Sequence, residues 1–429
     1  MTAYFNYYET TVERRAFTQL EGHHSTDVCI IGGGLTGVSS ALGLAEAGIA
    51  STLLEARCIG GCASGMNGGQ VIRGFAPRIQ EIEAAYGMDL SIQLFKLADR
   101  GLTRVFDNVE RFGIACDMRR GGLTAAIRPA HFPALMRDAE HLAALYDYPC
   151  LRPVAPAQLA DYVDSPRYHG GLYDPRGGQL NPLAYVLGLA HAASRLGAQL
   201  HEYSPALHLQ QRDGRWLIKT RKGSLSAERV IFASNAFTAD IERALAPAIL
   251  KVGTYQLATR PLSAQEAAAV GTAAVFDTHP FNHYFRKTPD QRLLFGCSIG
   301  TRQGPRPGDL RHIRRELGKL FPSLAGVEID YVWGGWMDIT ANHLPDIRET
   351  RDGRIVLQGF NGHGLNTTAM AADLAVAKLQ GQAQAFAPFA AIRHRALPGL
   401  PWSRLPLTWA GHIQYYLNAH LAGDRMDFA

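Results

Sequence analysis

The alternation of apolar and polar residues near the N-terminus predicts a strand, a helix and a second strand in direct succession. Residues 28–31 (VCII) are continuously apolar, as expected for a strand that is buried on both faces. In residues 35–47 (LTGVSSALGLAEA) the apolar side chains recur at helical spacing, and Gly48 ends the pattern. The segment 50–55 (ASTLLE) predicts a second strand, which Glu55 ends. This order is typical of an α/β fold with a parallel sheet.

Two later regions carry patterns of their own. The segments 253–262, 273–288 and 291–299 are rich in β-branched and aromatic residues and are separated by Pro, Asp and Gly turns, which predicts strands of a second sheet. Residues 353–379 predict a strand that ends at Leu357, a glycine-rich turn and a helix. Four aromatic residues of these strands could line a cavity, namely Tyr255, Phe281, Tyr284 and Phe285. Aromatic residues in strands nevertheless pack in a core more often than around a ligand.

Three glycines at the junction of the first strand and helix predict a dinucleotide site. Gly32, Gly34 and Gly37 form a GxGxxG triplet. The first glycine of such a triplet permits a tight turn, the second lets a pyrophosphate approach the backbone, and the third lets helix and strand pack closely. The helix N-terminus then offers N–H groups and a favourable dipole to the phosphates. Glu55 lies 18 residues beyond Gly37 and would accept hydrogen bonds from ribose hydroxyls.

The segment that follows Glu55 is more specific. Residues 62–70 read CASGMNGGQ and resemble GASGRNGGQ, which follows the ribose-binding Glu in the gamma-glutamylputrescine oxidoreductase branch of the D-amino-acid oxidase superfamily of FAD-dependent enzymes. Met66 departs from this pattern, because the branch has Arg there, and the change removes a cation. The resemblance extends over nearly the whole chain, because other parts of the branch are similar to residues 177–207, 230–238, 333–347 and 353–379.

The resemblance implies an α/β fold in which a Rossmann-like FAD-binding domain is interleaved with a mostly antiparallel β-sheet substrate domain. The expected divisions are an N-terminal lead-in at 1–26, a discontinuous FAD-binding domain at 27–100, 170–240 and 330–381, a substrate domain at 101–169 and 241–329, and a C-terminal tail at 382–429. Within that tail, residues 405–422 (LPLTWAGHIQYYLNAHLA) predict an amphipathic helix.

The resemblance also implies non-covalent FAD, since residues 62–71 contain no His and residues 333–368 contain no Cys. The helix that follows Leu365 would face the electron-rich N1 and O2 edge of the flavin with its positive N-terminus. The residues expected to bind FAD are Gly32, Gly33, Gly34, Leu35, Thr36, Gly37, Glu55, Ala56, Arg57, Ala63, Ser64, Gly65, Met66, Asn67, Gly68, Gly69, Gln70, Ala206, Ser234, Asn235, Phe360, Asn361, Gly362, His363, Gly364 and Leu365.

Candidate catalytic residues are fewer and carry weaker signals. Trp336, Tyr284 and His363 are the candidates for contact with the substrate, and Trp333 and Asp338 are further candidates for the cavity wall. Each has an equally good interpretation as a core residue, and a histidine in a turn is more often a hydrogen-bonding residue than a proton carrier. Cys297 is interpreted as a small buried residue of a strand.

The implied reaction is oxidation of an amine C–N bond, in which hydride passes to the flavin and water converts the resulting imine to an aldehyde. The expected substrate is a gamma-glutamylated polyamine or a similar amine. No second GxGxxG follows residue 100, so the electrons are not expected to come from NAD(P)H. The acceptor is oxygen or another carrier, such as a quinone.

Three alternatives remain at this point. A flavin disulfide reductase is suggested by Cys58 and Cys62, although that class has four residues between its cysteines and this pair has three. An RNA-modifying flavoprotein is compatible with a sequence pI of about 8.9. A non-catalytic flavin-binding protein would share the dinucleotide motif without oxidising an amine.

Composition and charge argue against a nucleic-acid-binding, membrane-spanning or secreted protein, but they do not indicate a particular function. The 43 Lys and Arg residues exceed the 38 Asp and Glu residues by only five, and no basic run concentrates them, so no nucleic-acid partner is expected. No segment approaches the ~18 apolar residues of a membrane span, and residues 1–26 lack the apolar core of a signal peptide, so a cytoplasmic protein is expected. Six scattered cysteines favour a reducing compartment, and no metal site is expected. The oligomeric state is left open.

Overall fold

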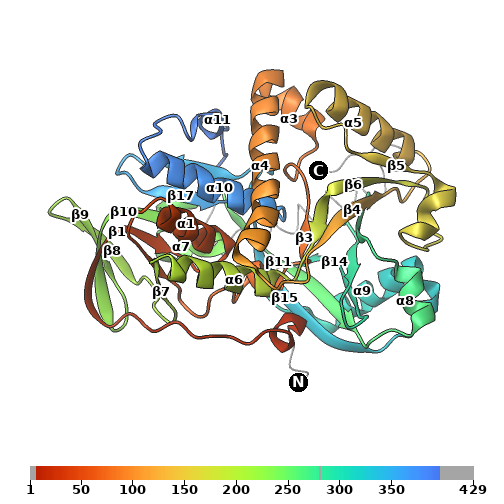
Figure 1. The fold of residues 1–429 in the computed structure, drawn as a ribbon, viewed down its shortest axis with the longest axis horizontal. Coiled ribbons are helices and arrows are strands. Elements are labelled where there is room, and N and C mark those ends of the chain that lie inside the picture. The colour runs from red at the N-terminus through yellow and green to blue at the C-terminus, as the bar shows by residue number, and fades with distance from the viewer. Residues whose placement is uncertain (1–5, 280–281, 301, 397–429) are drawn as a thin grey trace.

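The computed structural model describes residues 6–279, 282–300 and 302–396 and arranges them around two β-sheets (Figure 1). The first sheet lies on the left of Figure 1 with helices α1, α6 and α10 packed near it. The second sheet lies on the right, and the long helix α4 (Met88–Phe112) runs between the two halves. Among the described helices, none is long and apolar enough to cross a lipid bilayer.

The first sheet has a parallel centre, as the apolar runs predict. Its strands are in the order β16–β17–β10–β1–β2–β7, and the hairpin β8–β9 extends it from β10. All four residues of β2 are buried, including the polar Ser51 and Thr52. The strands are β1 (Gly22–Ile31), β2 (Ser51–Leu54), β7 (Gln199–His201), β8 (His208–Arg212), β9 (Arg215–Lys219), β10 (Gly223–Phe232), β16 (Asp346–Glu349) and β17 (Ile355–Gln358).

Three helices pack against this sheet, and glycines allow the closest backbone contacts in this region. The helices are α1 (Leu35–Glu46), α6 (Pro182–Arg195) and α10 (Gly364–Leu379). A Cβ atom at Gly37 would collide with the Gly32 carbonyl oxygen, so glycine allows α1 to approach β1. A Cβ atom at Gly101 would similarly collide with the Asn366 carbonyl oxygen, so α4 and α10 also touch through a glycine.

The second sheet is mostly antiparallel. Its order is β15–β11–β14–β13–β12–β4–β6–β3, with β5 paired to β6, and among the described pairs only β12 and β4 run parallel. The strands are β3 (Gln70–Val71), β4 (Arg119–Ala125), β5 (Arg152–Val154), β6 (Gly171–Gln179), β11 (Leu250–Thr259), β12 (Ala274–Asp277), β13 (Tyr284–Lys287), β14 (Leu293–Gly300) and β15 (Ile329–Ile339). The predicted fold class is therefore confirmed.

Helix α9 (Pro307–Leu320) packs on one face of the second sheet through Ile313, Leu317 and Leu320, which share a core with Phe285 and Phe295. The other helices are α2 (Ala63–Met66), α3 (Ile79–Tyr86), α5 (His131–Leu145), α7 (Thr238–Ile241), α8 (Ala264–Val270) and α11 (Ala387–Ala390). The short 3-10 helices are η1 (Tyr7–Thr10), η2 (Pro156–Asp161), η3 (Asn235–Phe237), η4 (Arg243–Leu245) and η5 (Pro322–Leu324).

Several predicted boundaries differ from the structure. The segment 273–288 forms two strands, β12 and β13, because the chain turns between Asp277 and Tyr284. The expected FAD-binding segments 170–240 and 330–381 begin with β6 and most of β15, yet both strands pair within the second sheet. The helix expected at 405–422 lies outside the described residues.

Candidate active site

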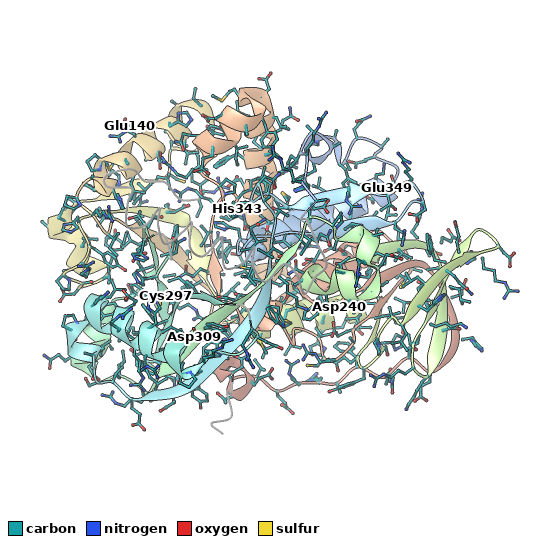
Figure 2. All side chains as sticks on the ribbon, turned by 180° about the vertical axis from the view of Figure 1, so that it is seen from behind. Glu140, Asp240, Cys297, Asp309, His343 and Glu349 are labelled. Carbon is teal, nitrogen blue, oxygen red and sulfur yellow. The ribbon has the colours of Figure 1, made fainter. Side chains whose placement is uncertain are left out.

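A cavity of about 1120 Å³ lies between the two sheets. One part of its wall is formed by the carboxyl ends of β1, β2 and β10 and the turn after β17, where open α/β sheets bind ligands. The other part is formed by β11, β13 and β15 of the second sheet. Figure 2 labels His343, Cys297 and Asp240, three residues that line this cavity. Its volume is sufficient for a large, elongated ligand.

Gly32 and Gly34 of the glycine triplet form the cavity wall at the N-terminus of α1. Gly32 has φ +115°, a conformation that other residues rarely adopt. Gly34 caps α1, and a Cβ atom there would lie 2.7 Å from Ser64 Oγ, which accepts a hydrogen bond from the Leu35 N–H at 2.8 Å. The missing side chain leaves the helix N-terminus open to the cavity, and this cradle fits a pyrophosphate.

Glu55 lies at the end of β2 and holds the same turn. Its carboxylate accepts hydrogen bonds from the Gly33 N–H at 2.7 Å and the Arg57 N–H at 2.8 Å. Burial raises the pKa of Glu55, although the two backbone donors act in the opposite direction. Glu55 therefore shapes the glycine turn in addition to facing the cavity, where it could accept a ribose hydroxyl.

The loop 62–70 is held by hydrogen bonds from distant parts of the chain. The Met66 carbonyl accepts from Gln256 Nε2 at 2.8 Å and from Trp333 Nε1 at 2.9 Å. Asn67 Nδ2 donates to the carbonyls of Ala63 and Ser64, both at 3.0 Å, which closes the loop on itself. This loop is therefore a rigid wall segment that connects the glycine turn with the second sheet.

The closing turn between β17 and α10 depends on one buried carboxylate. Asp338 is 1% exposed and accepts hydrogen bonds from the N–H groups of Gly359 and Phe360, the latter at 3.2 Å. Burial raises the pKa of Asp338 to about 6 against the effect of these donors. Gly359 and Gly362 have φ +77° and +81°, so the turn needs glycine at both positions. The turn places the N-terminus of α10 at the cavity.

Most of the predicted FAD-binding residues line this one cavity. The exceptions are Gly37, Gly65 and Gly69, which do not. A Cβ atom at each would collide with the backbone carbonyl of Gly32, Gly60 or Leu180 respectively, so these three glycines are required by packing of the chain on itself.

The three candidate catalytic residues also line the cavity, but one further candidate does not. The hydroxyl of Tyr284 lies 3.3 Å from Thr254 Oγ1, and burial raises its pKa, so it stays protonated. Burial lowers the pKa of His363 to about 4, so its ring is neutral at pH 7 and carries no charge to the site. Trp336 lines the wall, whereas Trp333 does not: it packs edge-on against Tyr8 and binds the Met66 carbonyl.

The other aromatic candidates are core residues or cannot be placed. Tyr255 is 2% exposed and donates to the Arg302 carbonyl, and Phe285 is 1% exposed in the core beneath α9. Phe281 lies outside the described residues. Cys297 is buried, as expected, but it also contributes to the cavity wall.

Sequence reasoning missed the contribution of β11. Alternate residues of this strand, Leu250, Val252, Thr254 and Gln256, line the cavity, whereas the opposite face carries Tyr255 and Leu257 into the core of the second sheet. The polar side chains of Thr254 and Gln256, two residues apart on one face of this strand, were an available signal. Other residues of the wall that the patterns did not indicate are Arg221, Asn282, Gln303, Met337 and His343.

A buried ion network supports the strand connection that bears Asn282 and Tyr284. His283 Nδ1 lies 2.7 Å from Asp277 Oδ2, and its Nε2 lies 3.7 Å from Glu316 Oε2 on α9. Asp277 also accepts from Tyr168 OH at 3.2 Å. Although burial opposes the charged form, these two carboxylates raise the pKa of His283 to about 9.

We expect the stability contributed by His283 to depend on pH. The group is protonated in the folded state up to about pH 9 but loses its proton near pH 6.5 when unfolded, so its contribution is complete below pH 6.5 and is lost as pH rises through 9. The free-energy advantage of the wild type over His283→Gln, measured by urea unfolding, should therefore shrink between pH 6.5 and 9.5. His208→Gln on the exposed hairpin is the control. If the stability difference between the wild type and His283→Gln stays constant across this pH range, His283 is not protonated in the folded protein.

Comparisons with known proteins agree with this geometry. A family model described as FAD dependent oxidoreductase matches residues 27–378. Gamma-glutamylputrescine oxidoreductase of Escherichia coli (strain K12) is 34% identical over 423 residues, which cover 97% of this chain and 98% of that protein. Probable oxidoreductase OrdL of Rhizobium meliloti (strain 1021) is 33% identical and covers 84% of this chain and 85% of its own length.

Solved structures share the fold at lower identity. L-proline dehydrogenase from P. horikoshii superposes with a TM-score of 0.73 at 20% identity, covering 85% of this chain and 95% of that structure. Glycine oxidase from Geobacillus kaustophilus gives a TM-score of 0.71 at 21% identity, covering 87% of this chain and all of that structure. This chain therefore shares its fold with these two solved structures.

Proposed function

Because the chain belongs to the family of FAD-dependent oxidoreductases, we propose that it oxidises the C–N bond of a long amine, such as a gamma-glutamylated diamine, in the cavity between the two sheets. FAD, when bound, supplies the acceptor for the hydride. The glycine turn, the loop 62–70 and the closing turn would hold the cofactor non-covalently. The walls from the second sheet would bind and orient the amine and exclude water.

The observation that carries this proposal is that, apart from the buried Asp338, the described residues of the second sheet that line the cavity are uncharged. The polar side chains of this wall include Thr254, Gln256 and Tyr284, none of which is charged. Among the described residues, the arginines that line the cavity are Arg57 and Arg221, and both lie on connections of the first sheet. An amine with a carboxylate beside its reactive carbon would find no cation among the described second-sheet residues that line the cavity.

A neutral wall also favours the form of the amine that can react. An alkylammonium ion loses solvation in such a cavity, so its pKa falls and the free amine becomes accessible without a strong base. Asp338 lines the wall, but its oxygens already accept from the Gly359 and Phe360 N–H groups. Its contribution is to hold the closing turn rather than to bind the ammonium group.

The site also favours a substrate whose carboxylate is far from the reacting amine. Met66 supplies no cation on the loop 62–70, so recognition of an acidic group close to the reactive carbon has no support there. A gamma-glutamylated diamine carries its carboxylate at the opposite end of a long chain. This chemistry matches the substrate in the name of gamma-glutamylputrescine oxidoreductase, the relative that is 34% identical.

Anaerobic stopped-flow reduction of the flavin tests the proposal. We expect gamma-glutamylputrescine to bleach the flavin faster than putrescine, sarcosine, D-alanine or NADH, because the neutral wall accommodates an extended amine. FAD release by acid precipitation, measured on the same preparation, checks that the cofactor is non-covalent. Reduction by NADH alone would disprove amine oxidation, and faster reduction by sarcosine or D-alanine would disprove the long-amine substrate.

A charge placed in the wall provides a matched control. Thr254→Arg should retain FAD but lose at least tenfold in the rate of flavin reduction by the long amine, because a long cationic side chain would fill the space proposed for the amine. Gln210→Arg adds the same charge to the exposed hairpin β8–β9, outside the cavity, and should leave the rate unchanged. Equal rates for Thr254→Arg and the wild type would place the amine elsewhere.

A further inference from the structure

Arg286 lies behind the cavity wall and is buried without an acidic partner. The residue is 3% exposed. Its Nε donates to the Gly68 carbonyl at 2.8 Å, and its Nη2 donates to the Tyr8 hydroxyl at 3.1 Å. Within the described residues, the guanidinium forms no ion pair with any carboxylate.

The groups around Arg286 do not neutralise its charge. Tyr8 is fully buried, and its hydroxyl donates to the Asn67 carbonyl at 2.9 Å. Burial raises the pKa of Tyr8, which keeps this hydroxyl uncharged. Asp290, the acidic residue in the turn after β13, forms its ion pair with Arg292 at 2.7 Å.

A buried cation without a counterion is costly, and hydrogen bonds to neutral oxygens compensate only part of that cost. The wall between Arg286 and the cavity is a single backbone segment, because Gly68 both accepts from Arg286 and lines the cavity. A Cβ atom at Gly69 would lie 3.1 Å from Arg286 Nε, so glycine allows this close approach. In a low-dielectric interior, a positive charge at this place attracts an anion across the wall.

We propose that Arg286 is a positioning residue whose buried positive charge stabilises negative charge on the flavin through the loop 67–69. Tyr8 supports the same loop by hydrogen bonding but contributes no charge. The inference rests on the proposed placement of FAD in this cavity and not on the identity of the amine. It can therefore hold even where the long-amine proposal fails.

The test measures sulfite binding to the oxidised flavin, because sulfite adds reversibly to the ring and leaves a negative charge on it. We expect Arg286→Gln to weaken sulfite binding at least tenfold. Arg286→Lys keeps the charge, and Tyr8→Phe removes only the supporting hydroxyl, so each should stay within about threefold of the wild type. Arg212→Gln on the exposed hairpin is the control for a general loss of positive charge.

The dissociation constant of FAD, measured separately for each variant, distinguishes charge from structure. Weaker sulfite binding in Arg286→Gln with FAD still bound supports the proposal. Unchanged sulfite binding in that variant would overturn it, as would an equal loss in Tyr8→Phe. If Arg286→Gln does not accumulate as holoprotein, Arg286→Lys decides: near-normal sulfite affinity supports the role of charge, and a tenfold loss overturns it.

Discussion

Valine at position 34 is expected to give a folded but colourless protein. Gly34 has φ −84° and ψ −174°, which any residue can adopt, and the Cβ atom would displace only the Ser64 side chain, whose hydroxyl accepts one hydrogen bond from the Leu35 N–H. The cost to the apoprotein is therefore small, whereas the added side chain occupies the space of the pyrophosphate. We expect FAD affinity to fall at least a hundredfold, measured by fluorescence titration of the apoprotein.

Two other glycines make this expectation specific. Gly37→Val should prevent folding, because its Cβ atom would collide with the Gly32 carbonyl oxygen. Gly326→Ala should behave like the wild type, because nothing lies within 4 Å of its Cβ position. A fully yellow Gly34→Val protein would mean that the dinucleotide lies elsewhere.

The second large effect is expected at Asp338. Asp338→Ala leaves the N–H groups of Gly359 and Phe360 without their acceptor in a buried site, at a cost of ~2–5 kcal/mol. The closing turn should loosen, and FAD should be lost together with stability. Urea unfolding of the apoprotein and FAD titration measure the two effects separately.

The conservative variant Asp338→Asn tests the charge. Because the folded pKa of about 6 exceeds the ordinary value of 3.8, the contribution of Asp338 to stability is complete below pH 3.8 and falls as pH rises through 6. Asparagine does not titrate. The stability of the wild type relative to Asp338→Asn should therefore decline between pH 4 and pH 7 and then level off, and a difference that rises with pH would contradict the assignment.

The parts of the site that depend on local sequence were predictable. The turn at Gly32, the helix that begins at Leu35 and the strand that precedes the closing turn all follow from patterns within a few residues. The resemblance of residues 62–70 added the identity of the cofactor. Together they indicated most of the residues that line one wall of the cavity.

The parts that depend on distant contacts were not predictable. Gln256 and Met66 are 190 residues apart in the chain, and their hydrogen bond depends on the pairing of β11 within the second sheet. Arg286 and Gly68 are 218 residues apart, and sequence alone gives no reason to connect them. Trp333 failed as a cavity candidate for the same reason, because the packing of Tyr8 against it decides which way it faces.

The order of strands in the first sheet also has a consequence for synthesis of the chain. β1 pairs with β10, which is translated about 200 residues later, and β10 pairs with β17, which is translated about 125 residues after β10. Such distant pairing is slow and leaves apolar strands exposed in the nascent chain. Because the proposed FAD cradle includes the turn after β17, we expect FAD to bind only after residues 359–365 have been translated and β17 has joined the sheet. FAD should then stabilise the folded protein by mass action, and it should give no protection to shorter nascent chains.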